Sequence, residues 1–594
     1  MLQIILCAPL LAAVIAGFGA SLMGEKPAQI LTTSVMFVVS GLSWVLLWGS
    51  EETVQHIFLV RFVESGYLTL DWGLRLDRLT AVMLVLVSSI SALVHLYSFG
   101  YMPNAPHWKK HQPYKARFFA YLSFATFAML VLVTADNLLQ MLLGWQALGI
   151  GAYLLTGFYY RKPGTGVAAS RVFVTNRVGD FTLLLAMILL LLEIESLNLD
   201  DITLAAPDLA RTTLRFLALE WNAAGLIGAL LLIAALSKAA QLFLHIWLPD
   251  AMQAPTPAAA LICATSMGTA GVFLLLRLAP LIDFAPQVKT VMLVMGASTA
   301  LFAASIAQVQ NDIKRALAYG LCVQLGYVFV VLGLGVYPAA LNLLLAQTLF
   351  NALLFLSAGS VIRAMQHQQD IRHFGGLRRK MPLTLAMTLI GTLIGTLLVA
   401  GMSSYYSWRL VFLTFFGKPR GEAKLHEPAR ESPLTMQLPM IALALAVIAV
   451  PIVLVSPALS LLTGWAMAAP FAMPLLGGLL AWVFYIRRPT LPKKLAKRLP
   501  GVHRFLLKQW YFEALYNLLL VRPVIFVGNM LWQRGEDRIL GGGADGIGLG
   551  LIPFLGKQLG PRHGGALLGY ALLMVLGVVG LIIWAALIGE GAHG

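Results

Sequence analysis

Long apolar stretches recur along the entire chain and alternate with short polar loops. About 20 consecutive apolar residues suffice for a helix that crosses a bilayer. The sequence holds about fifteen such stretches, near residues 2–22, 30–50, 79–100, 118–134, 136–158, 167–192, 222–244, 256–278, 289–309, 316–335, 338–363, 383–416, 436–455, 469–486 and 566–588. The pattern predicts an all-α, polytopic membrane protein of about 15 transmembrane helices.

Composition agrees with this interpretation. Hydrophobic residues make up 59% of the 594 positions and charged residues 11%, whereas a soluble domain has a charged share of about 25%. These values exclude a cytosolic enzyme, a disordered chain and a nucleic-acid-binding module. The three cysteines, Cys7, Cys263 and Cys322, lie in apolar stretches without a Cys-x-x-Cys spacing, so we predict neither a disulfide framework nor a metal site. No catalytic motif is visible, and any redox centre is expected on another chain.

The charges of the loops orient the helices. Residues 51–77 carry a net charge of −3, whereas residues 102–117 contain four basic residues and no acid. The positive-inside rule therefore places the second loop in the cytoplasm. Alternation predicts that the same side holds the loops around Arg161-Lys162, Asn311 to Arg315 and Arg372 to Lys380, with the acidic loop 193–221 outside.

Much of the net charge of +16 is concentrated near the C-terminus. Residues 487–565 contribute +9 of it, which we interpret as an amphipathic segment lying along the inner membrane surface. A last span follows at 566–588. Neither a nucleic acid nor an acidic ligand is needed to explain the surplus of basic residues.

One apolar stretch breaks the alternation of sides. Residues 366–382 and 417–433 are both basic, yet a single stretch of 34 residues, 383–416, separates them. One crossing would put one of the basic loops outside, which the positive-inside rule disfavours. We therefore predict a re-entrant or double-crossing hairpin, with arms near 383–398 and 404–416 and a hinge at Gly401-Met402-Ser403-Ser404.

Ionisable side chains inside an apolar stretch are costly and mark candidate sites. Lys238 lies about three-quarters of the way along the stretch 222–244 and is followed by His245. It is either a proton carrier, because burial favours the neutral form of an amine, or a structural cation held by carbonyl groups at a broken helix. Ala254-Pro255-Thr256-Pro257, which begins the next apolar stretch, indicates such a break.

Two further pairs of charges are candidates. Arg177 and Asp180 are three residues apart, so they share one face of a helix and can form an ion pair. That pair is either structural or tunes Lys238. Asp312 and Lys314 lie where a loop meets a helix and are more simply explained as solvated loop charges.

Several motifs occur together in the order known from one family. They are Ala135-Asp136-Asn137, Leu143-Gly144-Trp145, Arg177-Val178-Gly179-Asp180, Ser237-Lys238-Ala239-Ala240, Ala254-Pro255-Thr256-Pro257, Asp312-Ile313-Lys314-Arg315 and Gln324-Leu325-Gly326-Tyr327. On these motifs the chain resembles subunit L of the bacterial proton-translocating NADH:quinone oxidoreductase (complex I) over nearly its whole length. The segment after residue 487 resembles the extension that distinguishes subunit L from its shorter paralogues M and N.

The resemblance implies a distal membrane-arm subunit in the bacterial cytoplasmic membrane, beside subunits M, N and smaller ones. NADH, flavin, iron–sulfur clusters and quinone would be bound by other subunits, and this chain would hold no cofactor and no metal. It would contain N-terminal helices, two inverted five-helix repeats with broken helices, further helices, a long lateral helix and a terminal anchor. The corresponding ranges are 1–117, 118–278, 289–416, 436–486, 487–565 and 566–594. The implied proton path comprises Lys238, Asp180, Arg177, His245, Asp312 and Lys314.

The chain departs from the family pattern at positions that should titrate. Gln146 replaces a glutamate expected to pair with Lys238, and Cys263 replaces a histidine. The helix that should carry two histidines and a lysine has Leu343, Gln347 and Asn351 instead. The second broken helix lacks its Gly-Phe-Phe-Ser-Lys-Asp motif, as if a segment were absent within the predicted hairpin. An amide does not titrate, so we predict a subunit whose own proton path is impaired.

Three functions stay open at this point. The first is the complex I subunit, with its own proton path active or impaired. The second is a subunit of a cation/proton antiporter or of a bicarbonate-uptake complex, against which the long tail after residue 487 argues. The third is a non-pumping structural subunit, against which the retained Lys238 argues.

Overall fold

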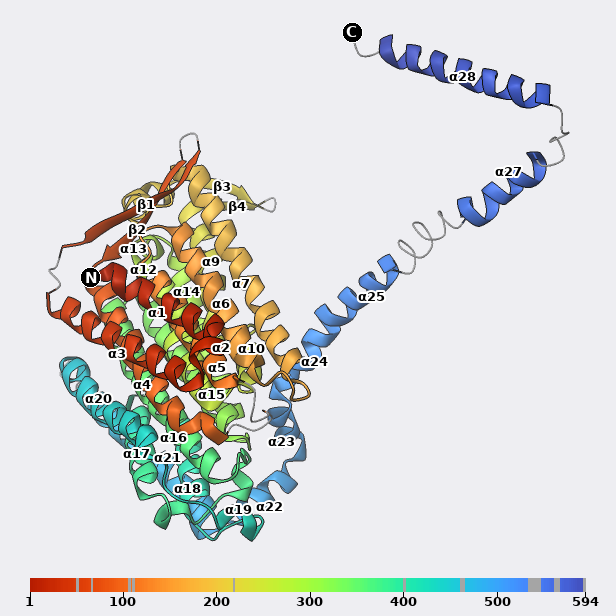
Figure 1. Ribbon diagram of the computed structural model, residues 1–594. Coiled ribbons are helices and arrows are strands. Elements are labelled where there is room, and N and C mark those ends of the chain that lie inside the picture. Colours follow the sequence, from red (N-terminus) through yellow and green to blue (C-terminus); the bar gives the residue numbers. More distant parts are fainter. Residues whose placement is uncertain are drawn as a thin grey trace. The chain divides into compact units, whose positions relative to one another are not determined.

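The computed structural model describes residues 1–49, 53–65, 68–104, 108, 113–216, 219–398, 402–459, 465–532, 546–559 and 567–590. The chain divides into two compact units, Met1–Trp510 and Tyr511–Gly594. Helices make up most of both units (Figure 1), which confirms the predicted all-α polytopic fold. Within the described ranges, nine helices are long and apolar enough to cross a membrane, and six shorter apolar helices accompany them. How many of them cross stays a prediction.

The helices of the first unit follow the predicted apolar stretches. The N-terminal part contains α1 (Leu2–Phe18), α2 (Ala20–Met23), α3 (Glu25–Gly49) and α4 (Arg78–Tyr101). The next part contains α5 (Tyr114–Val133), α6 (Leu138–Thr156), α7 (Thr165–Ile194), α8 (Leu199–Leu209), α9 (Ala223–Lys238), α10 (Trp247–Ala251), α11 (Thr256–Leu261), the π-helix η3 (Ile262–Ser266) and α12 (Met267–Arg277).

The remainder of the first unit is also helical. It contains α13 (Ala279–Asp283), α14 (Pro286–Ala307), α15 (Ile313–Gly333), α16 (Tyr337–Ala364), α17 (Pro382–Leu398), α18 (Met402–Phe415), α19 (Ala423–His426), α20 (Leu434–Leu459), α21 (Trp465–Trp482), η6 (Val483–Arg487), α22 (Leu491–Arg498) and α23 (Pro500–Leu507). Short 3₁₀ turns lie in the loops: η1 (Met102–Asn104), η2 (Gly157–Tyr159), η4 (Ile371–His373), η5 (Leu377–Arg379) and η7 (Gln509–Tyr511).

Two β-hairpins interrupt the helical fold, and the sequence analysis did not anticipate them. Strands β1 (Gln55–Ser65) and β2 (Leu68–Leu76) pair in antiparallel fashion, as do β3 (Thr213–Phe216) and β4 (Leu219–Asn222). Both fall in loops that we had interpreted from their acidic charge alone. Their aromatic and β-branched residues favour extended backbone, which is the signal that the charge count concealed.

The same local arrangement occurs twice in the first unit. An isolated antiparallel bridge joins Asn137 to Asn198, and a second one joins Asp312 to Asp370. The side chains of Asn137 and Asp312 cap the N-termini of α6 and α15, respectively, by accepting backbone hydrogen bonds. In both halves, one helix precedes the first residue of the bridge, and two helices separate that residue from its bridge partner. This order is the one expected of two repeats, whose boundaries stay a prediction.

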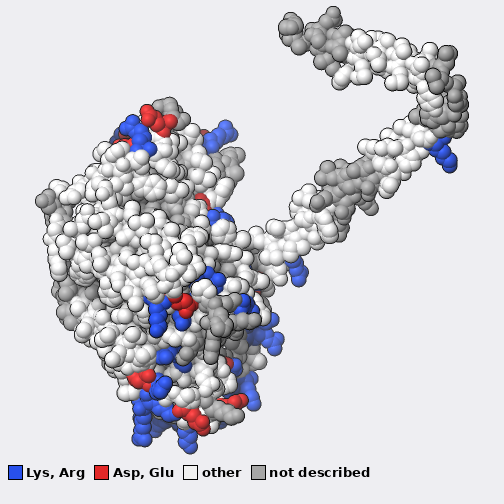
Figure 2. Space-filling model, in the orientation of Figure 1, with Lys and Arg blue, Asp and Glu red and all other residues white. Residues whose placement is uncertain are grey.

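The two bridges lie at opposite ends of α6 and its neighbours. Asn137 donates a hydrogen bond of 2.9 Å to the carbonyl of Asp71 in β2, so the first bridge lies at the hairpin face. Lys314, beside the second bridge, donates to carbonyls of residues 252 and 254, and Lys162 after α6 bonds Gln253. We call this end the basic face, formed by the loops 157–164, 252–255, 308–312 and 366–381. Lys and Arg gather there in Figure 2. The predicted basic loops around Arg161-Lys162, Asn311 to Arg315 and Arg372 to Lys380 thus share one end, whereas Lys109 and Lys110 of the loop 102–117 lie outside the described residues.

The stretch 383–416 forms the predicted hairpin. Its arms are α17 and α18. Of the predicted hinge, Gly401 lies outside the described residues, whereas Met402, Ser403 and Ser404 form the first turn of α18 instead. The loops that flank the arms bond to each other: Arg420 donates to the carbonyl of Phe374 at 3.0 Å, and Lys380 donates to the carbonyl of His426. Both flanking loops therefore lie at the basic face, as the charge pattern required.

The second unit consists of helices whose described side chains are mostly exposed. It contains α24 (Phe512–Tyr516), η8 (Asn517–Val521), α25 (Arg522–Met530), η10 (Gly546–Leu551), α27 (Ile552–Leu559) and α28 (Leu567–Glu590). The apolar helix α28 coincides with the predicted terminal anchor. The lateral course of residues 487–565 stays a prediction.

Candidate functional site

Lys238 is the last residue of α9 and is fully buried. The chain leaves the helix immediately after it, because Ala240 and Phe243 adopt positive φ angles of 49° and 70°, which side chains of this kind rarely adopt. The indole of Trp247 in α10 donates a hydrogen bond of 2.9 Å to the carbonyl of Ser237 across the break. Lys238 is thus a basic residue in the last turn of a helix, where the helix dipole favours positive charge. The predicted broken helix is present, and it breaks directly after Lys238, before the prolines.

Asp180 connects three helices at this site. Its carboxylate accepts a hydrogen bond of 2.7 Å from the indole of Trp145 in α6 and pairs with Arg177 of its own helix at 2.7 Å. The Lys238 ammonium lies 3.6 Å from Asp180 Oδ1, the oxygen that accepts from Trp145, and 5.2 Å from the centre of the Trp145 ring. The predicted ion pair between Arg177 and Asp180 is therefore present, and Lys238 belongs to the same cluster. Sequence reasoning missed Trp145, although it directly precedes Gln146 in a motif used for the resemblance.

Gln146 faces the arginine of this cluster. Its side-chain oxygen accepts a hydrogen bond of 2.6 Å from Arg177, and we had expected a partner of Lys238 at this position. A Cβ atom built on Gly149, less than one turn further along α6, would lie 3.2 Å from Arg177 Nη2 and 3.3 Å from Lys238 Nζ. Glycine therefore lets both cations approach α6. Two cations share the single carboxylate of Asp180, because an amide occupies position 146.

The close contact of α7 with α9 keeps the cluster together. A Cβ atom on Gly179 would lie 2.5 Å from the Cβ atom of Ser237, a distance that side chains do not tolerate. Glycine at this position thus allows the backbone beside Asp180 to approach the backbone beside Lys238.

His245 and Cys263 are buried between the two halves of the first unit. The His245 ring packs against Phe302 of α14 with their centres 4.5 Å apart. Cys263 lies on the π-helix between α11 and α12. A π-helical segment often marks a functional position, and here it presents a thiol where the family pattern has an imidazole.

Lys314 is buried, which corrects the expectation of a solvated loop charge. Its ammonium donates hydrogen bonds of 2.6 Å and 3.0 Å to the carbonyls of Met252 and Ala254 at the break between α10 and α11. Asp312 caps the same helix by accepting from the backbone N–H groups of Lys314 and Arg315. Lys314 therefore links α15 to the break between α10 and α11.

Amide side chains fill the centre of the second half. Asn351 of α16 donates to the side-chain oxygen of Gln324 in α15 and to the carbonyl of Gln347 one turn earlier, the latter at 2.8 Å. All three residues are buried, and Leu343 lies a further turn away at a partly exposed position. Gln324 lies in a motif that we had quoted only for the resemblance. These groups can hydrogen-bond, but they cannot take up or release a proton near neutral pH.

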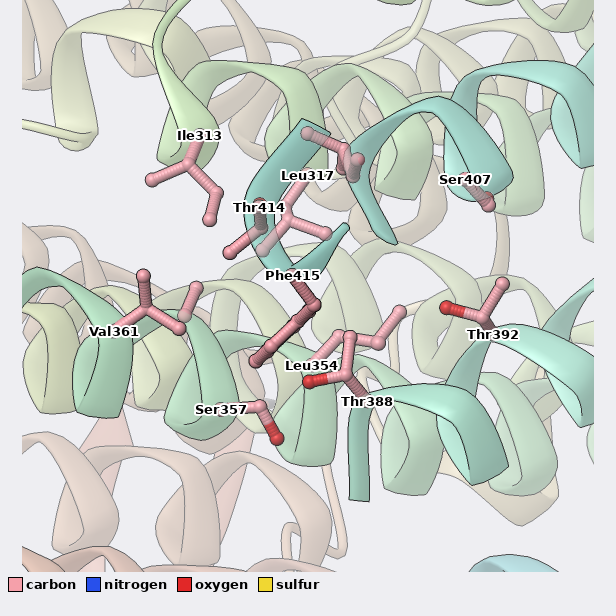
Figure 3. A pocket seen from close by; sticks show the side chains of 12 residues that line it. Ile313, Leu317, Leu354, Ser357, Val361, Thr388, Thr392, Ser407, Thr414 and Phe415 are labelled. Carbon is pink, nitrogen blue, oxygen red and sulfur yellow. The ribbon is translucent and has the colours of Figure 1, made fainter. Parts of the chain in front are cut away.

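A small cavity of about 30 Å³ lies between α15, α16, α17 and α18. Figure 3 shows hydroxyl groups among the apolar side chains that line it, those of Ser357, Thr388, Thr392, Ser407 and Thr414. A water molecule needs about 10–15 Å³ of such space, so the cavity has room for about two. Hydroxyl groups can bind water there, but they do not hold an excess proton.

A second charge cluster lies at the hairpin face, and sequence reasoning missed it. Asp77 caps α4, accepts a hydrogen bond of 3.1 Å from Arg75 and pairs with Arg277 of α12. Burial alone would raise the pKa of the Asp77 carboxyl, but the charge and the hydrogen bond of Arg277 outweigh it and hold this pKa well below its ordinary value. Asp77 and Arg277 are 200 residues apart, so no spacing in the sequence reveals the pair.

The described residues contain no group of three or more side chains arranged to hold a metal ion. The ionisable side chains that the structure brings together can bind protons. In the first half these side chains are Lys238 and Asp180, whereas the positions of α16 that the family pattern reserves for titratable groups are Leu343, Gln347 and Asn351.

Two family profiles match the sequence. The one described as NADH:quinone oxidoreductase/Mrp antiporter, TM, matches residues 135–414, and NADH-Ubiquinone oxidoreductase (complex I), chain 5 N-terminus, matches residues 62–119. NADH-quinone oxidoreductase subunit L of Rhodobacter capsulatus is 42% identical, with 98% of this chain and 99% of the relative covered. NADH-ubiquinone oxidoreductase chain 5 of Chondrus crispus is 36% identical, with 91% and 90% covered.

A solved structure has a similar fold. A chain of the Mrp complex from Dietzia sp. DQ12-45-1b superposes with a TM-score of 0.70 at 21% identity, covering 89% of this chain and 60% of that one. The alignment with the Rhodobacter relative runs over 704 positions, whereas this chain has 594 residues, so at least 110 positions are gaps in this chain. The chain belongs to the family of subunit L of NADH:quinone oxidoreductase, the antiporter-like membrane-arm subunits of complex I that take part in proton translocation.

Proposed function

We propose that this chain occupies the distal position of a complex I membrane arm in a bacterial cytoplasmic membrane, with subunits M and N and smaller subunits as neighbours. The relatives named subunit L support this, since they match over almost their whole length. NADH, flavin, iron–sulfur clusters and quinone are then bound by other subunits. The basic face is the cytoplasmic one, because Lys and Arg favour that side. Residues 487–565 run laterally along it, and residues 566–594 provide an anchor.

Within this role, the first repeat keeps a group that can exchange a proton. Lys238 is buried, lies 3.6 Å from Asp180 and is a primary amine, whereas the guanidinium of Arg177 stays protonated in proteins. Gln146 cannot supply a second titrating carboxylate. The cluster can therefore hold a proton on Lys238, with Asp180 in place of the second carboxylate that the family pattern has at position 146.

The second repeat does not hold a proton at its centre, and this observation carries the proposal. Leu343, Gln347 and Asn351 stand where the family pattern has two histidines and a lysine, and the buried Asn351 amide donates to the side chain of Gln324 and to the backbone carbonyl of Gln347. Helix α16 contains no histidine, lysine or acid. We therefore propose that the complex translocates protons while this subunit contributes no complete crossing of its own.

The decisive experiment compares the number of protons moved per NADH oxidised in vesicles that hold the whole complex. Lys238→Ala is expected to leave this ratio unchanged, because the path is already interrupted at Asn351. A fall in the ratio would show that the chain translocates protons and would refute the proposal. Lys289→Ala is a matched control, since Lys289 forms an ion pair with Asp283 at the end of α13, away from Lys238.

An independent antiporter or a bicarbonate-uptake subunit is the second candidate, favoured by the fold shared with the Mrp chain. Purification of this chain through an affinity tag separates the two functions. Co-purification of NADH dehydrogenase activity supports the complex I subunit. Its absence from a preparation that retains the other membrane subunits would favour the antiporter.

A further inference from the structure

An open cleft lies where α18, η6, α22 and α23 meet the basic face. It has a volume of about 710 Å³ and is lined by the end of α14, by α18 and by the segment 484–506. A second hollow of about 570 Å³ continues from it between α18 and α21. The two share the side chains of Gln308, Tyr405, Phe484 and Leu495. We call the first the basic cleft and the second its apolar extension.

The basic cleft is strongly cationic. Among the described residues that line it are Arg372, Arg409, Arg420, Lys493 and His503, and none of the lining residues is acidic. Asp370 outside the lining neutralises Arg372 alone. Arg409 is 5% exposed, donates to the carbonyl of Gln310 at 2.7 Å, and its Nε has no hydrogen-bond partner among the described residues. An anionic group would therefore complement the charge of the residues that line the basic cleft.

The apolar extension continues from that charge between α18 and α21. It is lined by Met402, Met473, Leu476, Leu480 and Phe484 together with Gly477 and the shared residues. Leu413 lines the basic cleft and Met402 the extension, so the two span about 16 Å along α18 at 1.5 Å per residue. That length is about half of the ~30 Å hydrocarbon core, or the depth of one leaflet.

The neighbouring helix has the character of a membrane-surface helix. Helix α22 carries Lys493, Lys494, Lys497 and Arg498 within eight residues and directly follows the apolar helix α21 and η6. Basic clusters next to a transmembrane helix attract anionic lipids. Only Lys493 of these four lines the basic cleft, beside Leu495 and Ala496.

We propose that the basic cleft and its extension bind one anionic diacyl phospholipid of the cytoplasmic leaflet. The phosphate lies among Arg372, Arg420 and Lys493, and the acyl chains lie along α18 and α21. The lipid covers the side of the short hairpin arm α18, whose 14 residues span only about 21 Å. The proposal is independent of whether this subunit translocates protons.

The test uses the assembled complex in phosphatidylcholine nanodiscs that contain a trace of photoactivatable phosphatidylglycerol. After irradiation, mass spectrometry is expected to find the label on residues 402–413, 473–484 and 493–496. Excess unlabelled phosphatidylglycerol should displace it, whereas phosphatidylcholine and inorganic phosphate should not. Displacement by inorganic phosphate would assign the cleft to the free ion and overturn the lipid proposal.

Two variants of α22 make the test specific. Lys493→Gln is expected to lower labelling about fivefold, the effect of about 1 kcal/mol per basic residue near a membrane surface. Lys497→Gln removes the same charge from the same helix outside the cleft and should leave labelling within the cleft unchanged. Equal losses of labelling in the two variants would mean that the lipid is attracted by the general charge of the surface, and would refute a defined site. NADH:quinone reductase activity of both complexes verifies assembly.

Discussion

Asp180→Asn should destabilise the first repeat, because it leaves two cations without a counter-charge. The substitution keeps the size of the side chain and an oxygen that can accept from Trp145. It removes the negative charge that lies 2.7 Å from Arg177 and 3.6 Å from Lys238. Arg177 is 37% exposed and can turn toward solvent or lipid headgroups, whereas Lys238 is 0% exposed and cannot.

The magnitude follows from the contact with Lys238. Two unit charges 3.6 Å apart interact by about 5 kcal/mol at an effective dielectric constant of about 20. Removal of one partner of a buried ion pair typically costs about 3–5 kcal/mol. Both routes give the same range. The penalty should diminish as the pH rises, because a neutral Lys238 amine no longer needs the carboxylate.

The assay is a double-mutant cycle of Asp180→Asn and Lys238→Met, with unfolding of the subunit followed in mixed detergent micelles. The single Asp180→Asn variant should lose about 3–5 kcal/mol. The double variant should lose less than the sum of the singles, with a coupling of about 2 kcal/mol or more. A coupling near zero would show that Lys238 does not depend on Asp180, and the description of one shared cluster would be wrong.

Four other substitutions test the fold around the site. The pKa of the Asp77 carboxyl is held below its ordinary value. The contribution of Asp77 to stability is therefore complete above about pH 4 and is lost as the pH falls further. Asp77→Asn should flatten this dependence of the thermal unfolding temperature on acid pH. Asn137→Ala and Asp312→Ala each remove a helix cap and should each lower the free energy of unfolding by about 1 kcal/mol, measured by denaturant titration. A much larger loss in one of the two variants would mean that the two caps are not equivalent. Gly179→Ala puts a methyl group 2.5 Å from Ser237 and should lower stability by about 1–3 kcal/mol, measured by the detergent midpoint.

The helices were predictable because each needs only its own apolar residues. The stretches 2–22, 79–100 and 289–309 correspond to α1, α4 and α14 with boundaries shifted by a few residues. The hairpin formed by α17 and α18 was predictable for another reason, since loop charge constrains on which side a segment ends. The strands β1 and β2 were not predicted, because their pairing is a contact between segments that the charge count treated as one loop.

The site was predictable where partners lie on one helix and unpredictable where they lie on different ones. The pair of Arg177 and Asp180 follows from their spacing. The capture of Arg177 by Gln146 and the burial of Lys314 against the break before α11 depend on how helices pack. Charged residues where a loop meets a helix are usually solvated, and Lys314 is an exception. Its side chain turns inward because carbonyl groups at the break of a helix accept hydrogen bonds from it.

The amides of the second half and the short hairpin support one another energetically. A lysine at position 351 would be buried beside Gln324 and the Gln347 carbonyl, which are neutral acceptors, and an unpaired buried charge costs several kcal/mol. In the family pattern the second broken helix carries a lysine and an acid, and residues 382–408 of this chain contain neither. Asn351→Lys alone should therefore lower stability by about 3–5 kcal/mol in detergent unfolding, with Asn351→Leu as the uncharged control. A lysine variant as stable as the leucine variant would mean that a hidden counter-charge exists, and the second half could then hold a proton after all.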